Sequence, residues 1–69
     1  MTQKERIYQY MVTFGSITPM EAFSDLGITK LSTRIGEMIA DGKRIQKTTE
    51  RGANRYGEIV WWTRYRLDS

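Results

Sequence analysis

Hydrophobic side chains recur at three- and four-residue steps in three segments of the chain, 3–14, 19–26 and 30–41. This spacing places apolar groups on one face of a helix and polar groups on the other, so it predicts three amphipathic helices. Each apolar stripe is expected to face a common core. The stripes consist of Ile7, Tyr8, Tyr10, Met11 and Phe14 in the first segment, Ala22, Phe23 and Leu26 in the second, and Leu31, Ile35, Met38 and Ile39 in the third.

Capping residues predict where these helices begin and end. Thr2 and Thr18 each precede a glutamate by three residues, the spacing of a capping box in which hydroxyl and carboxylate accept hydrogen bonds from each other's backbone amides. Pro19 suits the first helical position, because it lacks the amide hydrogen that would be unpaired there. Thr29 is the expected N-cap of the third helix. Each helix is expected to end at a glycine that can adopt a left-handed conformation: Gly15, Gly27 and Gly42.

The alternation of polar and apolar residues changes to a period of two after residue 42, which predicts strands at 44–50 and 58–67. The segment between these strands holds two glycines and an asparagine, a composition typical of a hairpin loop. Ser16-Ile17 is at most one short edge strand. Every second residue of the last strand is expected to face the core: Ile59, Trp61, Thr63, Tyr65 and Leu67.

Trp61 and Trp62 are adjacent in a predicted strand and therefore point to opposite faces of it. One should enter the core, and the other must be covered by a helix, a partner subunit or a ligand, or else stay partly exposed. We expect both to pack within the domain, with a dimer or partner surface as the alternative. Met11 and Met38 are assigned to the core, and Met20 is the expected exception.

The composition limits the chemistry available to the chain. It has 69 residues, with no cysteine and no histidine. A chain of this length buries only roughly 60% of the surface exposed when unfolded, so we expect a single domain, residues 1–69, without an enclosed substrate chamber. Without cysteine and histidine there are no disulfides, no thiol nucleophile, and neither the commonest general base nor the commonest nitrogen ligand of metals. We expect no enzyme, no cofactor and no metal site.

Two further function classes find little support in the sequence. Glu21 and Asp25 lie four residues apart and could share a helix face, where two carboxylates could hold a divalent cation or act in acid–base chemistry. A capping role for Glu21 and a solvated helix end for Asp25 explain them better. No apolar run approaches the roughly 20 residues of a membrane span, and the N-terminus lacks the apolar stretch of a signal peptide. We therefore expect a cytoplasmic protein without a membrane partner.

Positive charge is concentrated in the C-terminal third. The net charge is +3, but residues 1–42 carry four basic against five acidic side chains, a balance of −1. Residues 43–69 carry seven basic against three acidic side chains, a balance of +4. Cations that meet phosphates supply most of the sequence-independent affinity for nucleic acids. The predicted hairpin is therefore the best candidate for electrostatic contact with a nucleic acid.

Two short helices joined by Gly27-Ile28 are followed by a basic hairpin. The segments that carry this arrangement read ITPMEAF at 17–23, LGIT at 26–29, RIGEM at 34–38, DG at 41–42 and WTRYRL at 62–67. In these segments the chain resembles the winged helix-turn-helix family, particularly its small members common in phages and prophages. The resemblance implies an α+β fold of three helices followed by a β-hairpin wing. It also implies binding of double-stranded DNA, with the third helix in the major groove and the wing on the backbone or minor groove.

The residue types on the third helix and the wing agree with this function. Lys30 could reach guanine, Glu37 could accept from cytosine, and the hydroxyls could meet several base edges. Arg34 lies on the flank, where a phosphate contact is favoured, and an exposed wing arginine could track phosphates or enter a narrow minor groove. The predicted DNA-binding residues are Thr29, Lys30, Ser32, Thr33, Arg34 and Glu37 on the helix, and Lys47, Arg51, Asn54 and Arg55 on the wing.

Several alternatives stay open at this point. Arg34 could simply pair with Glu37 three residues on, and the basic hairpin could protect an exposed strand edge. The leading hypothesis is a phage or prophage transcription regulator or an excisionase-like recombination factor that binds double-stranded DNA. A protein interaction module that does not bind DNA is the alternative, and structured RNA is a third candidate ligand. A homodimer or another protein partner is compatible with the sequence.

Overall fold

The structure, a computed structural model, describes residues 1–68 and contains three helices and one antiparallel sheet. The predicted α+β fold of three helices and a hairpin is confirmed, and Ser16-Ile17 forms the short strand. In chain order the elements are α1 (Gln3–Phe14), β1 (Ser16–Ile17), α2 (Pro19–Leu26), α3 (Leu31–Ala40), β2 (Ile45–Ala53) and β3 (Ile59–Leu67).

Both predicted capping boxes are present. The Thr2 hydroxyl accepts from the Glu5 amide at 3.1 Å, and the Glu5 carboxylate accepts from the Thr2 amide at 3.2 Å. The same pair of bonds forms between Thr18 and Glu21, at 3.2 and 2.9 Å. Gly15 ends α1 with a φ of 87°, a left-handed conformation that most side chains disfavour. Because each of these signals acts within four residues of sequence, the helix ends follow directly from local chemistry.

The start of α3 differs from the prediction. Lys30, not Thr29, is the N-cap residue, and no side chain accepts a hydrogen bond from the first amides of the helix. Lys30 has φ −113° and ψ 48°, so the chain enters the helix by a route that leaves the Thr29 hydroxyl outside the capping position. The exposed threonine therefore has no structural role at this helix start.

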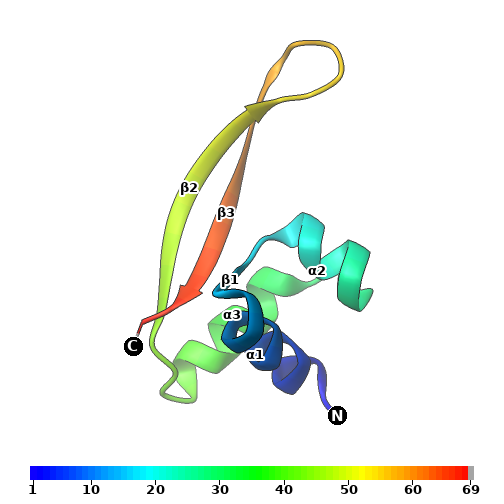
Figure 1. Cartoon of the computed structure of the whole chain (residues 1–69). Coiled ribbons are helices and arrows are strands. Elements are labelled where there is room, and N and C mark those ends of the chain that lie inside the picture. Colours follow the sequence, from blue (N-terminus) through cyan, green and yellow to red (C-terminus); the bar gives the residue numbers. More distant parts are fainter. Residues whose placement is uncertain (69) are drawn as a thin grey trace.

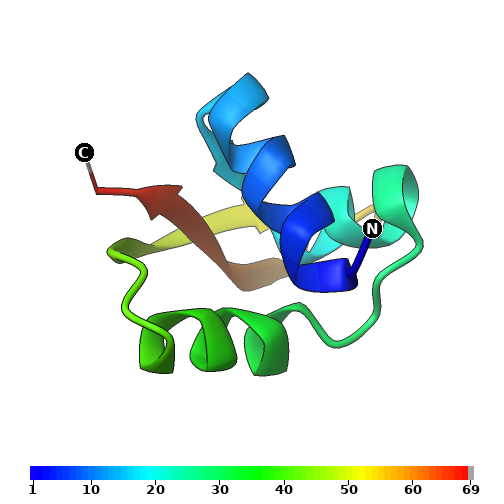
Figure 2. The same cartoon turned by 90° about the horizontal axis from the view of Figure 1, so that it is seen from below.

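The core lies between the three helices and the end of the sheet that is lower in Figure 1. Ile7 and Met11 of α1 meet Leu31 and Ile35 of α3 there, and all four are buried. Figure 2 shows α1 and α3 flanking the lower ends of the strands. The other buried apolar side chains are Ile17, Ala22, Ile28, Met38 and Tyr65. Met11 and Met38 are thus in the core as expected, whereas Met20 is 72% exposed.

The sheet has the order β1-β3-β2, with every neighbouring pair antiparallel. Ile17 pairs with Tyr65 on one side of β3, and the β2 register runs from Ile45 opposite Leu67 to Ala53 opposite Ile59. β2 therefore continues beyond its predicted end, and the loop is limited to residues 54–58. In Figure 1 the hairpin, which we define as residues 45–67, extends well beyond the helices. The domain measures 38 × 22 × 21 Å as a result.

The length of the hairpin overturns the expectation that every second residue of β3 faces the core. Tyr65 is 5% exposed, and Leu67 packs against the core. Trp61 and Ile59 share their face but are 63% and 62% exposed, because the helices cover only the lower end of the strands. The expectation that both tryptophans pack within the domain is wrong for Trp61. Phe23, assigned to the buried side of α2, is also 60% exposed, and Phe14 and Ile39 of the other two stripes are 67% and 39% exposed.

Candidate nucleic-acid interface

The outward face of α3 carries short polar side chains. Ser32 and Thr33 are exposed in the first turn, and Thr29 and Lys30 are exposed just before it. The opposite face holds the buried stripe of Leu31, Ile35 and Met38, so the exposed face is fixed in direction by core packing. These four predicted contact residues thus lie together at one end of α3.

Arg34 and Glu37 are engaged with each other. The Arg34 guanidinium lies 3.1 Å from the Glu37 carboxylate, and its Nε donates to the Gln3 side chain of α1 at 3.0 Å. The Arg34–Glu37 pair, which the sequence left open as an alternative to a DNA contact, is therefore present. Neither residue offers an unpaired charge, and Arg34 also ties α3 to the start of α1.

Asn54 organises the hairpin turn. Its side-chain oxygen accepts from the backbone amides of Tyr56 at 2.9 Å and Glu58 at 3.1 Å, and its Nδ2 donates to the Glu58 carboxylate at 3.3 Å. An asparagine that accepts from amides two and four residues on stabilises a tight turn. Asn54 therefore shapes the loop that presents Arg55. Both the oxygen and the nitrogen of the Asn54 side chain form hydrogen bonds within the turn.

The hairpin presents four cations that form no ion pair with an acidic side chain among residues 1–68: Lys47, Arg51, Arg55 and Arg66. Lys47 and Arg51 lie on one face of β2, opposite Tyr65 and Trp61, and Arg55 lies in the turn. Within residues 1–68, the ion pairs involve only the basic side chains of Lys4, Arg34 and Arg64. The excess of positive charge in the C-terminal third of the sequence therefore lies on exposed side chains of the hairpin.

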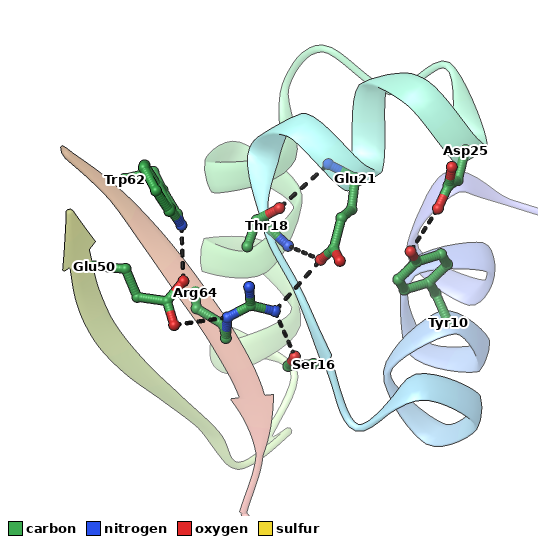
Figure 3. Close-up of polar contacts among 8 residues, drawn as sticks. All are labelled: Tyr10, Ser16, Thr18, Glu21, Asp25, Glu50, Trp62 and Arg64. Carbon is green, nitrogen blue, oxygen red and sulfur yellow. Dashed lines mark hydrogen bonds and ion pairs between the residues drawn. The ribbon is translucent and has the colours of Figure 1, made fainter. Parts of the chain in front are cut away.

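Arg64 is a residue that the sequence analysis did not single out. Its Nε donates to Glu50 of β2 at 2.9 Å, and its Nη1 donates to the Ser16 hydroxyl at 2.9 Å and lies 3.5 Å from the Glu21 carboxylate (Figure 3). One guanidinium thus joins β2, β1 and the first turn of α2. These contacts connect residues 14 to 48 positions apart, so no local sequence pattern reveals them.

Glu50 is held by two donors. Besides Arg64, the indole Nε1 of Trp62 donates to its carboxylate at 2.8 Å. The Arg64 bond first, and the Trp62 bond second, keep the pKa of Glu50 below its ordinary value of 4.5. Trp62 is half-buried because its ring lies over Gly52, where an added Cβ would come within 2.8 Å of it. Glu50, Trp62 and Gly52 together fix one face of the hairpin.

The two acidic residues of α2 have separate structural partners. Glu21 caps the helix and lies near Arg64, while Asp25 accepts a 2.5 Å hydrogen bond from the Tyr10 hydroxyl. This bond is the main reason that the pKa of Tyr10 is raised to about 12. Among residues 1–68 there is no group of three or more acidic side chains placed to hold a metal ion. None of the helices is long and apolar enough to cross a membrane.

Comparison with known proteins identifies the arrangement. A family model described as a winged helix-turn-helix domain matches residues 2–69. Neither a curated protein nor a solved structure matches the chain. The family match and the observed order of helices and strands point to the same fold.

Proposed function

Since the chain belongs to the winged helix-turn-helix domain family, a fold that suggests DNA binding, we propose that it binds double-stranded DNA with α3 and the hairpin. Domains of this family are typically non-enzymatic DNA-binding modules. In such folds the third helix enters the major groove, and the wing contacts the backbone or the minor groove. The exposed end of α3 and the basic hairpin are the matching surfaces of this chain.

The observation that carries the proposal is the set of unpaired cations on the hairpin. Lys47, Arg51 and Arg55 are exposed and stand apart from the ion pairs of residues 1–68. A cation already paired with a carboxylate gains little from a phosphate, because the first partner must be given up. Unpaired cations instead release condensed counterions from DNA, which is a large favourable term at low salt.

Readout of sequence is assigned to the start of α3. Lys30, Ser32 and Thr33 are exposed and have side chains that can hydrogen-bond to base edges. Thr29 adds a hydroxyl beside them. Glu37 is exposed one to two turns further on, where its carboxylate could accept from cytosine if Arg34 moved to a phosphate. These contacts would supply preference for a sequence, and the hairpin would supply most of the affinity.

The finer proposal is a phage or prophage regulator of transcription or an excisionase-like recombination factor. Its support is the resemblance to the small winged helix-turn-helix proteins common in phages and prophages, which rests on segments 17–23, 26–29, 34–38, 41–42 and 62–67. Selection of bound duplexes from a random pool gives the preferred site. Half-sites repeated about one DNA turn apart would indicate a homodimer, and a single short site would indicate a monomer.

The first test of the proposal is titration of a labelled duplex at several salt concentrations. We expect affinity to fall steeply with salt, with a slope of about −0.9 per phosphate contacted. Replacing Arg51 or Arg55 with alanine should reduce this slope by about one each. Arg6→Ala, which removes an exposed and unpaired charge from α1, is the matched control and should leave the slope unchanged. No binding at about 50 mM salt would refute the proposal.

Variants of α3 test the groove assignment separately. Lys30→Ala and Thr33→Ala should change which duplexes are selected, with a cost of about 1–3 kcal/mol at the affected base pair. Ala40, also exposed on α3, offers the control Ala40→Ser, which should leave the selected sequences unchanged. If neither Lys30→Ala nor Thr33→Ala alters preference, α3 is not the element that reads the sequence.

A further inference from the structure

The two adjacent tryptophans have different surroundings. Trp62 is held over Gly52 and donates its indole hydrogen to Glu50. Trp61 has 63% of its surface exposed, and its indole nitrogen forms no hydrogen bond with any residue in 1–68. Burying a tryptophan removes roughly 150–250 Å² of surface from water. An exposed tryptophan therefore contributes little to folding, and a ligand that covers it would bury this apolar surface. Trp62 is thus a structural residue, and Trp61 is available to a ligand.

Cations and hydroxyls surround Trp61 on its face of the hairpin. Arg51 pairs directly with it across the strands, and the guanidinium lies 6.0 Å from the centre of the indole ring. Lys47 lies on the same face, four residues from Arg51, which corresponds to about 13 Å along a strand. Thr49, opposite Thr63, lies between them, and Ile59 extends the apolar surface toward the turn.

This combination of groups defines the chemistry of a ligand. Two unpaired cations along one strand favour an elongated anionic chain, and a flat exposed indole favours a chain that carries flat apolar rings. Single-stranded DNA has both features, because its phosphates repeat along the backbone and every base has a π-face that can stack on an aromatic side chain. We propose that this face of the hairpin binds unpaired nucleobases, with Trp61 as the stacking platform and Arg51 and Lys47 on the flanking phosphates.

The proposal rests on the proposed function, because it assumes that the hairpin is a nucleic-acid surface. It goes further in naming an unpaired base as the ligand. In an intact duplex the faces of the bases are stacked on one another, and exposing one costs a few kcal/mol. The exposed indole therefore gains more from a strand that is already open, such as the melted or displaced strand beside a bound duplex.

Fluorescence of Trp61 can be isolated to test the stacking. In Trp62→Phe the indole of Trp61 is the sole tryptophan, and position 62 keeps an aromatic ring. We expect the oligonucleotide dT12 to quench this emission, because a stacked base changes the surroundings of the indole. In otherwise unchanged protein, Trp61→Ala should weaken binding of labelled dT12 by about tenfold or more, and Trp61→Phe should restore part of the loss.

An abasic strand of twelve residues is the matched control ligand, since it has the charge of dT12 without the bases. We expect it to bind more weakly than dT12 to wild-type protein and equally to wild type and Trp61→Ala. Equal binding of dT12 and the abasic strand would overturn the proposal. A wild-type dimer that Trp61→Ala dissociates, seen by sedimentation, would also overturn it by assigning Trp61 to a subunit interface.

Duplex titration separates this inference from the function on which it rests. If the wild-type protein binds duplex DNA and Trp61→Ala weakens duplex and dT12 alike, Trp61 is an ordinary duplex contact and the stacking proposal is wrong. Selective loss of dT12 binding supports it. If the wild type binds no duplex but still binds dT12 through Trp61, the proposed function fails while the stacking site stands. Circular dichroism of each variant confirms that the fold is intact.

Discussion

Arg64 donates its Nε hydrogen to the Glu50 carboxylate at 2.9 Å although the strand register places it opposite Thr48. The pair is therefore diagonal, because Glu50 lies two residues further along β2 than Thr48, the directly opposed residue. Because the same guanidinium reaches Ser16 and Glu21, this diagonal contact ties the hairpin to β1 and α2. The contacts of Arg64 thus help to fix the direction in which the hairpin projects from the helices.

Arg64→Ala is expected to destabilise the fold by about 2 kcal/mol. The substitution removes charge-assisted hydrogen bonds, which contribute roughly 1.5–3 kcal/mol each, and leaves the half-buried Glu50 without its cation. Arg64→Lys keeps the charge but loses the fork geometry, so its loss should be intermediate. Urea unfolding followed by circular dichroism measures both. Equal stability of wild type and Arg64→Ala would show that the three contacts contribute nothing net.

The ion pair also predicts a pH dependence. The pKa of Glu50 lies below its ordinary value of 4.5 in the folded protein, so its carboxylate stabilises the fold above pH 4.5. This contribution should be lost as the pH falls through the lowered pKa, since protonation favours the unfolded state there. Glu50→Gln should remove this part of the acid-induced loss. A comparison of unfolding between about pH 2 and pH 7 tests it, and parallel profiles for the two proteins would contradict it.

Local signals explain why the helices could be predicted and why the packing of the hairpin could not. The capping boxes at Thr2 and Thr18 act over three residues, so the sequence alone locates the starts of α1 and α2. Tyr65 and Trp61 follow the same alternation, yet one is 5% and the other 63% exposed. Their difference depends on how far the helices reach along the hairpin, which is a property of the assembled fold and not of the strand.

The predicted contact residues divide in a similar way. Lys47, Arg51 and Arg55 are predicted from their charge, and all three are exposed on the hairpin. Arg34 has the same charge but is occupied by Glu37 and Gln3, and the Gln3 contact spans 31 residues. Residue type therefore indicates which side chains could meet DNA, while non-local contacts decide which of them are unpaired.

Tyr10→Phe tests the contact between α1 and α2. The Tyr10 hydroxyl donates to Asp25, and this bond raises the pKa of Tyr10 from 10.0 to about 12. The neutral phenol is favoured in the folded state, so its contribution is present below pH 10 and lost as the pH rises toward 12. Wild-type protein should lose stability over this interval, and Tyr10→Phe should lose less. Tyr8→Phe is the control, and an identical alkaline profile for wild type and Tyr10→Phe would argue against the contact.

Gly52→Ala should be more harmful than the same change at Gly36, a helical glycine with open space around it. A Cβ at residue 52 would lie 2.8 Å from the Trp62 ring, so the indole must shift and its bond to Glu50 must lengthen or break. Overpacking of this kind costs about 1–3 kcal/mol. Gly36→Ala is the matched control, because its added Cβ has no atom within 4 Å apart from its chain neighbours and the nearby backbone of its own helix, and alanine favours a helix by up to about 1 kcal/mol over glycine. Urea unfolding should therefore show opposite signs for the two substitutions, together with a change in tryptophan emission for Gly52→Ala alone. Stabilisation by Gly52→Ala would mean that Trp62 moves freely and does not depend on the space above residue 52.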